Sequence, residues 1–286
     1  MAGSDLRRRS RPIPRALSIA GSDSGGGAGI QADLKAFAAC GVHGMTAIAA
    51  ITAQNTVQVT DVVSVSPEMI LAQVRAVAHD IGVDAVKVGM LGTVETIQAV
   101  ATALDELGPG TPVVLDPVMV AESGADLLDP AARSALVRLL LPRATVVTPN
   151  LPEALALISE ERADLNTADL NTADLDETDL DPADLARAIH ALGPSFVVVT
   201  GGHREQATDV CFDGSRVIEI AGERYPDGAA HGSGCTHSSV LAARLAWGDT
   251  PLQAARTAKR RASEAVRDGL ASIGAGNGPV DVLGVT

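Results

Sequence analysis

The hydrophobic positions of the chain fall into two kinds of segment, which together predict an α/β fold. Short runs of Val, Ile, Leu and Ala are typical of strands that are buried on both faces of a sheet. Between them lie segments with the three- and four-residue spacing of amphipathic helices, as in Ile30, Leu34 and Phe37. The expected strands span residues 16–20, 45–52, 85–91, 113–119, 144–150 and 196–202. This alternation predicts a mostly parallel central sheet with helices on both faces.

Capping and turn residues mark several boundaries in this pattern. Ser66-Pro67 predicts the start of a helix that runs to about Ile81, and Asp129-Pro130 predicts another. The segment DVCF-DG-SRVIEI predicts a hairpin, with Asp213-Gly214 in a tight type I′ turn. Two long helices are expected near the C-terminus.

We expect one domain over residues 16–286, because no linker interrupts the alternation. Residues 1–15 have the composition of a disordered basic tail. An acidic insertion is expected at about 160–181, where Asp-Leu recurs every five residues. The period fits neither helix nor strand, and its few copies would form little more than one coil of a pentapeptide β-helix. We therefore interpret it as a low-complexity surface segment.

Composition narrows the possible functions. The net charge of −13 and only five aromatic residues disfavour nucleic-acid binding, and no apolar run reaches the length of a membrane span. The three cysteines are widely separated, which favours a reducing cytoplasm over a disulfide or zinc framework. Residues 160–185 hold ten acidic residues and one arginine, so the overall charge says little about an active site.

The segment AGSDSGGGAGIQADLKAF, from Ala20 to Phe37, has five glycines within nine residues after a strand. It lacks the Walker lysine, and Ile30 breaks the dinucleotide-binding fingerprint. A tight turn alone needs one or two glycines. We therefore expect the backbone to approach a ligand closely here.

A second glycine segment, HGSGCT, leads directly into a helix. The backbone N–H groups of Gly232, Ser233 and Gly234 are expected to form an anion hole at the helix N-terminus. Cys235 lies at the same position, where the helix is expected to lower the pKa of the thiol. A buried, inert cysteine is the alternative interpretation.

Acidic residues follow two of the expected strands. Asp116 comes after VVL, and Asn150 and Glu153 come after TVVT. Carboxylates at this edge of a parallel sheet suit Mg²⁺, although Asp-Pro and Asn-Leu-Pro are also ordinary helix-start sequences. Together with an anion hole they indicate phosphoryl transfer.

Seven motifs in order, from the glycine segment through AQNT, KVGML, VLDPVM, TPNLPEA and GGH to HGSGCT, resemble hydroxymethylpyrimidine/phosphomethylpyrimidine kinases of thiamine biosynthesis. These enzymes belong to the ribokinase-like superfamily. The resemblance runs from about Ala16 to Pro279 and implies a single ribokinase-like domain. It also implies a Mg-ATP-dependent kinase that phosphorylates 4-amino-5-hydroxymethyl-2-methylpyrimidine and then its monophosphate.

The resemblance also implies roles for individual residues. Cys235 with Gly232, Ser233 and Gly234 would act on the hydroxymethyl group and the phosphates. Asp116 and Glu153 would be the ligands of Mg²⁺. The nucleotide would be bound by Asn150, Thr200 and Lys259. Thr200 stands where many relatives have lysine. The pyrimidine would be bound by Gly21, Asp33, Gln54, Met90 and Val118.

Further expectations are a homodimer, a cytoplasmic location and a K⁺ requirement that the sequence does not decide. Two other functions stay open: a pyridoxal-type kinase of the same superfamily and a non-catalytic pyrimidine-binding module. The glutamine of AQNT argues against the first, and retention of Asp116, Glu153 and HGSGCT argues against the second. The failed fingerprint disfavours a nicotinamide oxidoreductase.

Overall fold

A computed structural model describes residues 12–121, 124, 127–164, 181–201, 207–225 and 228–285. Most of the predicted basic tail, residues 165–180 of the acidic insertion and the histidine of GGH lie outside these ranges. Two boundaries of the expected segments fall on regular structure: Arg15 begins the first strand, and the helix before the insertion runs to Asp164. No helix in the described part of the chain has the length and apolarity to cross a membrane.

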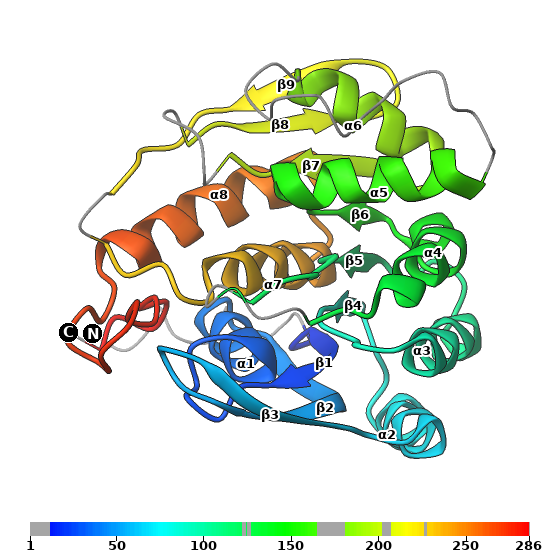
Figure 1. Cartoon of the computed structure of the whole chain (residues 1–286), viewed down its shortest axis with the longest axis horizontal. Helices are drawn as coiled ribbons and strands as arrows, with labels where there is room; N and C mark the ends of the chain where they lie inside the picture. Colours follow the sequence, from blue (N-terminus) through cyan, green and yellow to red (C-terminus); the bar gives the residue numbers. More distant parts are fainter. Residues whose placement is uncertain are drawn as a thin grey trace, which may run out of the picture.

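The central sheet has the order β3-β2-β1-β4-β5-β6-β7-β8-β9 (Figure 1). The pairs from β2 to β7 are parallel, and the edge strands β3, β8 and β9 pair antiparallel. The expected mostly parallel sheet is confirmed. The strands are β1 (Arg15–Ser22), β2 (His43–Gln54), β3 (Val59–Ser64), β4 (Ala85–Val88), β5 (Val113–Leu115), β6 (Val146–Val147), β7 (Phe196–Val199), β8 (Asp209–Phe212) and β9 (Val217–Ile220).

Helices cover both faces of the sheet, as predicted. One face carries α1, α7 and α8, and the other carries α2 to α6 (Figure 1). The helices are α1 (Gly29–Ala39), α2 (Pro67–Asp80), α3 (Val94–Glu106), α4 (Pro130–Leu139), α5 (Leu151–Asp164), α6 (Pro182–Ala191), α7 (Ser233–Ala246) and α8 (Pro251–Arg267), with a short 3₁₀ turn at Leu141–Arg143.

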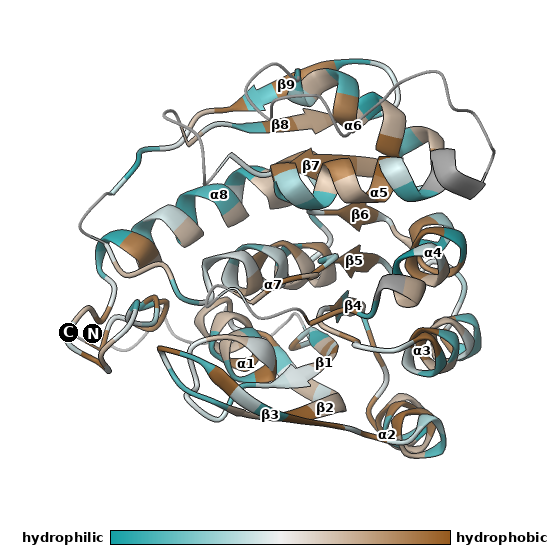
Figure 2. Ribbon diagram, in the orientation of Figure 1, coloured by the Kyte–Doolittle hydropathy of each residue, from teal (hydrophilic) through white to brown (hydrophobic). Residues whose placement is uncertain are grey.

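Two hydrophobic cores hold these layers together. Strand residues alternate between them: Leu17 and Ile19 of β1 pack under α2 to α6, whereas Ala16 faces α1 and α7. The central strands are hydrophobic along their whole length, as expected for a sheet covered on both sides (Figure 2). The sheet is therefore a rigid base for the residues at its edge.

Of the predicted caps and turns, one helix cap is confirmed and one hairpin turn is shifted. The cap at Ser66 is confirmed, since its side chain accepts the N–H of Met69 at 3.3 Å. The predicted β8–β9 hairpin forms, but its turn lies one residue later than expected. The N–H of Asp213 donates to the carbonyl of Arg216, so Gly214 and Ser215 are the central residues. The Asp213 carboxylate accepts the N–H groups of Ser215 and Arg216, which fixes this register.

Strands β4 to β7 are shorter than the hydrophobic runs that predicted them. The run 113–119 forms a strand only over Val113–Leu115, and 144–150 only over Val146–Val147. The remaining residues leave the sheet and turn toward its carboxyl edge. Several of the residues that leave the sheet line a cavity.

Candidate active site

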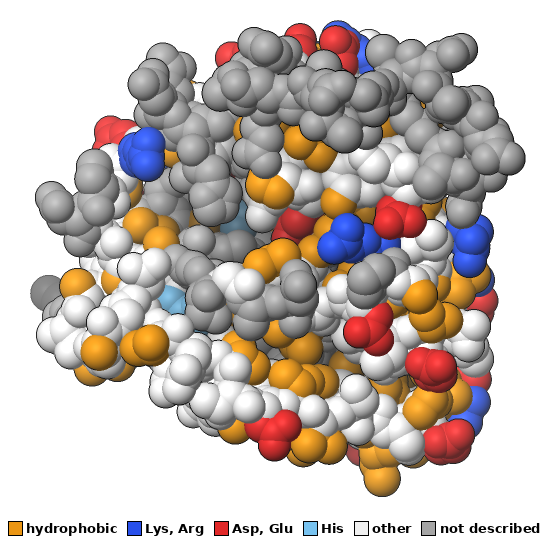
Figure 3. All heavy atoms as spheres, in the orientation of Figure 1, with side chains coloured by type: hydrophobic (Ala, Val, Ile, Leu, Met, Phe, Trp, Pro, Cys, Tyr) orange, Lys and Arg blue, Asp and Glu red, His pale blue; other side chains and the backbone are white. Residues whose placement is uncertain are grey.

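A cavity of about 1020 Å³ opens at the carboxyl edge of the parallel strands. Its wall takes residues from the ends of β1, β4, β5, β6 and β7 and from the start of α7. In the space-filling view this face is hollowed near its middle, and histidine side chains are visible there (Figure 3). The volume lies at the upper end of the range of ligand pockets, about 300–1,000 Å³, so it has room for more than one small ligand.

The cavity brings together nearly all of the predicted site residues, although they are up to about 240 positions apart in the chain. Asp33 is the exception. The predicted residues that line it are Gly21, Gln54, Met90, Asp116, Val118, Asn150, Glu153, Thr200, Gly232, Ser233, Gly234, Cys235 and Lys259.

The first glycine loop is held in shape by Asp23. One carboxylate oxygen of Asp23 accepts the N–H of Gly25 at 2.7 Å, and the other accepts those of Gly27 and Ala28 at 3.0 and 2.8 Å. His231 Nε2 lies 3.0 Å from that second oxygen. Burial acts to raise the pKa of Asp23, but His231 and the backbone donors outweigh it and lower the pKa. The loop is thus organised by a buried carboxylate.

The two glycine loops contact each other directly. A Cβ at Gly27 would lie 2.1 Å from the His231 ring, and a Cβ at Gly232 would lie 1.8 Å from the Gly27 carbonyl oxygen. Gly232 also has a φ of +81°, which favours glycine. These glycines therefore allow the two backbones to approach each other closely, whereas the sequence predicted a close approach of the backbone to a ligand.

Helix α7 begins at this junction and points its N-terminus into the cavity. Gly232 is its N-cap, and the first turn contains Ser233, Gly234 and Cys235. Within the described backbone, the N–H groups of Gly234 and Cys235 have no carbonyl partner, as is usual for a first helical turn. Such N–H groups and the helix dipole suit an anion.

Asp33 lies beneath the cavity and not on its wall, which corrects the predicted pyrimidine contact. It is fully buried and accepts Lys87 Nζ at 3.0 Å, Ser18 Oγ at 2.5 Å and Ser239 Oγ at 2.6 Å. Lys87 is also fully buried, and its Nζ lies 3.8 Å from Asp116. A buried ammonium needs a paired carboxylate, and Asp33 supplies it.

The expected low thiol pKa of Cys235 is wrong in this structure. Burial raises the pKa of Cys235 to about 12, although the nearby Lys87 ammonium and the N–H of Gly29 act to lower it. Asp33 and Asp116 raise it further. Desolvation and two carboxylates therefore outweigh the helix N-terminus and Lys87. At neutral pH the thiol of the ligand-free protein holds its proton.

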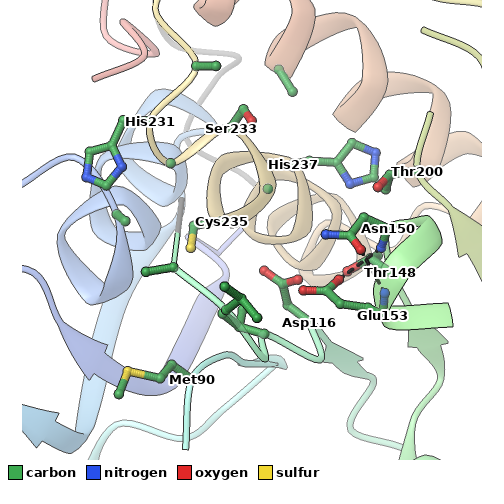
Figure 4. A pocket seen from close by; sticks show the side chains of 18 of the residues that line it. Met90, Asp116, Thr148, Asn150, Glu153, Thr200, His231, Ser233, Cys235 and His237 are labelled. Atoms are coloured by element: carbon green, nitrogen blue, oxygen red, sulfur yellow. Dashed lines mark hydrogen bonds between the residues drawn. The ribbon is translucent and has the colours of Figure 1, made fainter. Parts of the chain in front are cut away.

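Asp116 and Glu153 point toward the same part of the cavity (Figure 4). Burial raises the pKa of Glu153 to about 8, and the charge of Asp116 adds to this effect. Burial also raises the pKa of Asp116, whose carboxylate accepts Ser238 Oγ at 2.8 Å. Two buried carboxyl groups that disfavour each other's ionisation would both be stabilised by a cation.

Asn150 has a structural role besides any role toward nucleotide. Its side-chain oxygen accepts the N–H of Glu153 at 2.9 Å, and Glu153 Oε2 accepts the N–H of Asn150 at 2.9 Å. This reciprocal pair is a capping box for α5. It fixes the Glu153 carboxyl group in the cavity.

No group of three or more His, Cys, Asp or Glu side chains able to hold a metal occurs in the described part of the chain. Mg²⁺ does not need one, because it binds through one or two carboxylates together with waters and substrate phosphates. The Asp116–Glu153 pair and the N-terminus of α7 line one cavity. The residues present therefore fit Mg²⁺ together with a phosphate chain.

Lys259 is less available to a nucleotide than predicted. Its Nζ lies 2.6 Å from Asp209 Oδ1, and both side chains are buried. Burial acts to raise the pKa of Asp209, but the neighbouring His237 ring and the Lys259 ammonium lower it. Thr200 lines the cavity beside this group and contributes a hydroxyl without charge.

Sequence reasoning missed Asp23, Lys87, Asp209, His231 and His237. Two signals could have found some of them. Asp23 precedes a glycine turn, where an aspartate commonly accepts backbone N–H groups. Lys87 interrupts the continuous apolar run of β4, and a lysine buried in such a strand requires a partner. Asp209 and His237 show no local signal, because only the fold brings them together.

Comparisons with known proteins agree with this site. Residues 23–281 match the phosphomethylpyrimidine kinase family. The hydroxymethylpyrimidine/phosphomethylpyrimidine kinase of Rhizobium meliloti is 47% identical over 93% of this chain and 95% of its own. The enzyme of the same name from Mycobacterium tuberculosis is 41% identical over 94% of both chains.

Solved structures extend the similarity to the whole fold. The ADP complex of Bacillus subtilis pyridoxal kinase has a TM-score of 0.76 and 37% identity over 91% of this chain and 93% of its own. Phosphomethylpyrimidine kinase from Clostridium difficile has a TM-score of 0.71 and 37% identity over 89% of this chain and 100% of its own. The expected ribokinase-like fold, shared with these kinases, is confirmed. The chain belongs to the phosphomethylpyrimidine kinase family, and it is an ATP-dependent kinase that phosphorylates thiamine precursors.

Proposed function

We propose that the protein transfers the γ-phosphoryl group of ATP twice. The first acceptor is the hydroxyl of 4-amino-5-hydroxymethyl-2-methylpyrimidine, and the second is the phosphate of the resulting monophosphate. The observation that carries this proposal is the convergence of two carboxyl groups, Asp116 and Glu153, with the N-terminus of α7 and Cys235 on one cavity. Relatives named for both kinase activities support the two acceptors.

The pyrimidine binds at the end of β1 and β4. Gly21 donates its N–H to the Met90 carbonyl at 3.1 Å, and a Cβ on Gly21 would lie 2.8 Å from the Met90 sulfur. The strand order reverses between these two strands, which is where open α/β sheets bind ligands. Gln54 supplies an amide with donor and acceptor atoms for an aminopyrimidine edge, and Val118 lines the same cavity.

The phosphates bind at the N-terminus of α7. The N–H groups of Gly234 and Cys235 would contact the transferred phosphoryl group, and Asp116 and Glu153 would hold Mg²⁺. When bound, Mg²⁺ supplies neutralisation of phosphate charge. Asn150, Thr200 and Lys259 line the part of the cavity assigned to the nucleotide.

The transfer forms a bond between the acceptor oxygen and the γ-phosphorus and breaks the bond to the bridging oxygen of ADP. In the first step the acceptor hydroxyl must lose a proton, and Cys235 in its thiolate form is the side chain proposed to take it. Lys87 is the cation that favours the thiolate, against the burial that disfavours it. In the second step the acceptor is already an anion near neutral pH, since the second pKa of a phosphate monoester is about 6.

The test is an assay of ADP release with three acceptors supplied separately: the pyrimidine alcohol, its monophosphate and pyridoxal. We expect turnover with both pyrimidines. A protein that releases ADP with neither pyrimidine would contradict the proposal.

Pyridoxal is the second candidate acceptor, favoured by a specific observation. The Bacillus subtilis pyridoxal kinase shares 37% identity and the fold with this chain. A kcat/KM for pyridoxal above that for the pyrimidine alcohol would make pyridoxal the main substrate and Gln54 the residue to re-examine.

A homodimer and a cytoplasmic location are further parts of the proposal. Exposed hydrophobic side chains on β2 and β3, which include Ile51, Val62 and Val63, are a surface that a second copy would cover. The described cysteines are all unpaired, which suits a reducing compartment. Size-exclusion chromatography with light scattering tests the dimer.

A further inference from the structure

Three buried side chains form a charged group on the wall of the cavity, and we call it the Asp209 group. Asp209 begins β8, His237 lies in the second turn of α7, and Lys259 belongs to α8. They are 1%, 5% and 8% exposed. Three separate elements thus place these side chains together, and each of them lines the cavity.

Two members of the Asp209 group satisfy each other. Asp209 Oδ1 accepts Lys259 Nζ at 2.6 Å and the N–H of Gly201 at 3.0 Å. The ammonium and the carboxylate therefore cancel in charge. On its own this pair contributes no net positive charge to the cavity.

His237 is not satisfied. Both of its ring nitrogens and Asp209 Oδ2 have no hydrogen bond to any described residue. His237 Nε2 lies 3.3 Å from Asp209 Oδ2, which is ion-pair distance without the alignment of a hydrogen bond. Buried polar atoms in native proteins nearly always have a partner. An unpartnered ring on a cavity wall indicates that the partner is a ligand.

The two serines that follow His237 in α7 find partners, whereas the buried hydroxyl of Thr236 has none among the described residues. Ser238 Oγ donates to Asp116, and Ser239 Oγ donates to Asp33. In the close view the His237 ring projects from α7 toward the ends of β6 and β7, near Asn150 and Thr200 (Figure 4). Of the two unpartnered side chains, Thr236 and His237, only His237 lines the cavity.

We propose that His237 binds the polyphosphate chain of ATP, donating one ring N–H to a phosphate oxygen and the other to Asp209 Oδ2. His237 lies one turn after Gly234 in α7, and both residues line the cavity. A ring that donates to both a carboxylate and a phosphate links the Asp209 group to the nucleotide. The inference rests on the proposed function only in that ATP binds this cavity.

The experiment measures ADP binding by calorimetry without metal in wild type, His237→Leu and His237→Gln. Loss of a hydrogen bond to a charged group predicts an ADP dissociation constant raised roughly ten- to hundredfold in His237→Leu. The neutral amide of His237→Gln should recover part of this loss. His79→Leu, an exposed histidine on α2, is the matched control and should leave ADP affinity unchanged. Pyrimidine affinity serves as the control for folding.

A second measurement uses the wild type, in case His237→Leu does not fold. Nitrogen-15 NMR, with the ring assigned by its absence in His237→Gln, should show the His237 nitrogens moving to protonated shifts when ADP is added. Unchanged shifts, unchanged ADP affinity, or an equal loss of affinity for adenosine would overturn the inference. Normal pyrimidine phosphorylation with these results would leave the proposed function intact. ADP binding that depends on His237, without turnover of either pyrimidine, would support this inference and contradict the proposed function.

Discussion

Cys235 shows how one residue is governed by competing effects. The helix N-terminus and Lys87 favour the thiolate, whereas burial, Asp33 and Asp116 disfavour it. The structure places the thiol where the sequence predicted, yet with the opposite shift of its pKa. A motif gives the position of a group along a helix, but desolvation depends on everything that packs around it.

We expect Cys235→Ala to slow the alcohol step more than the monophosphate step. A positioned base typically contributes about 10²–10⁴-fold, and only the alcohol needs one. Because the thiol pKa is about 12, the thiolate fraction rises about tenfold per pH unit below it, so kcat of the alcohol step should rise from pH 7 to 9. The measurement is kcat against pH for each acceptor supplied separately.

Cys235→Ser fills the same volume and serves as the control for pocket shape. Equal losses in both steps, or a pH slope retained by Cys235→Ala, would mean that Cys235 shapes the pocket and takes no proton.

Glu153 should make the ligand-free protein less stable as the pH rises. Its pKa is raised from 4.5 to about 8 in the fold, so the folded state binds a proton that the unfolded state releases between these values. The stabilisation is present below pH 4.5 and is lost as the pH rises toward 8. Glu153→Gln should therefore flatten this pH dependence and stabilise the protein at pH 8 by at least about 1 kcal/mol, the value of one pKa unit. Urea unfolding at pH 6 and pH 8 measures it.

Mg²⁺ requires the ionised carboxylate, so its binding in the presence of nucleotide should release a proton below pH 8. Calorimetry in buffers of different ionisation enthalpy detects that proton. Its absence, with normal Mg²⁺ affinity, would remove Glu153 from the metal site, and Asp116→Asn provides the parallel comparison.

At the scale of elements, the hydrophobic pattern predicted which segments form strands and helices but not where the strands end. The run 113–119 has the pattern of one strand, because Val118 and Met119, which line the cavity, are as apolar as the strand residues before them. Asp33 shows the corresponding limit for the site. Its position on α1 was clear from the sequence, but only the packing of α1 against β4 shows that it faces Lys87 and not a ligand.

Contact between the two glycine loops makes Gly232 sensitive to any side chain. In Gly232→Ala the added Cβ would meet the Gly27 carbonyl oxygen, on top of the strain of φ +81°. We expect a loss of about 2–5 kcal/mol in unfolding free energy, from left-handed strain and overpacking together, and loss of turnover. Chemical denaturation and the ADP-release assay measure the two effects.

Gly110 offers a matched control for that substitution. Its φ is +95°, but a Cβ there would meet nothing within 4 Å. Gly110→Ala should cost only the strain, about 1–2 kcal/mol, and leave turnover unchanged. If both variants lose the same stability and both stay active, the loop contact has no role in shaping the site.

At the scale of the whole molecule, the predicted insertion lies between two helices on one face of the sheet. The described chain runs to Asp164 at the end of α5 and resumes at Asp181, which caps α6 through the N–H of Ala183. Replacing residues 166–180 with a short glycine-serine linker should leave unfolding free energy and turnover nearly unchanged. Loop-closure entropy changes by only about 0.6 kcal/mol per doubling of length.

The replacement also removes five acidic residues, so the protein should elute earlier from an anion-exchange column. Thermal unfolding and the assay with both pyrimidines complete the measurement. A variant that is insoluble or inactive would show that the segment contributes to the folded kinase.

The hydrogen bond between His231 and Asp23 joins positions 208 residues apart, and the first glycine loop is shaped partly by it. During synthesis the N-terminal strands emerge first and can pair as the chain grows. Helix α7, with the anion-binding backbone and the residues beside it, leaves the ribosome only when about four fifths of the chain exists. A nascent chain can therefore have most of its sheet and no catalytic ability. Premature termination before α7 would yield inert fragments in which one face of the sheet has lost most of its cover, and nucleotide could stabilise only the finished product.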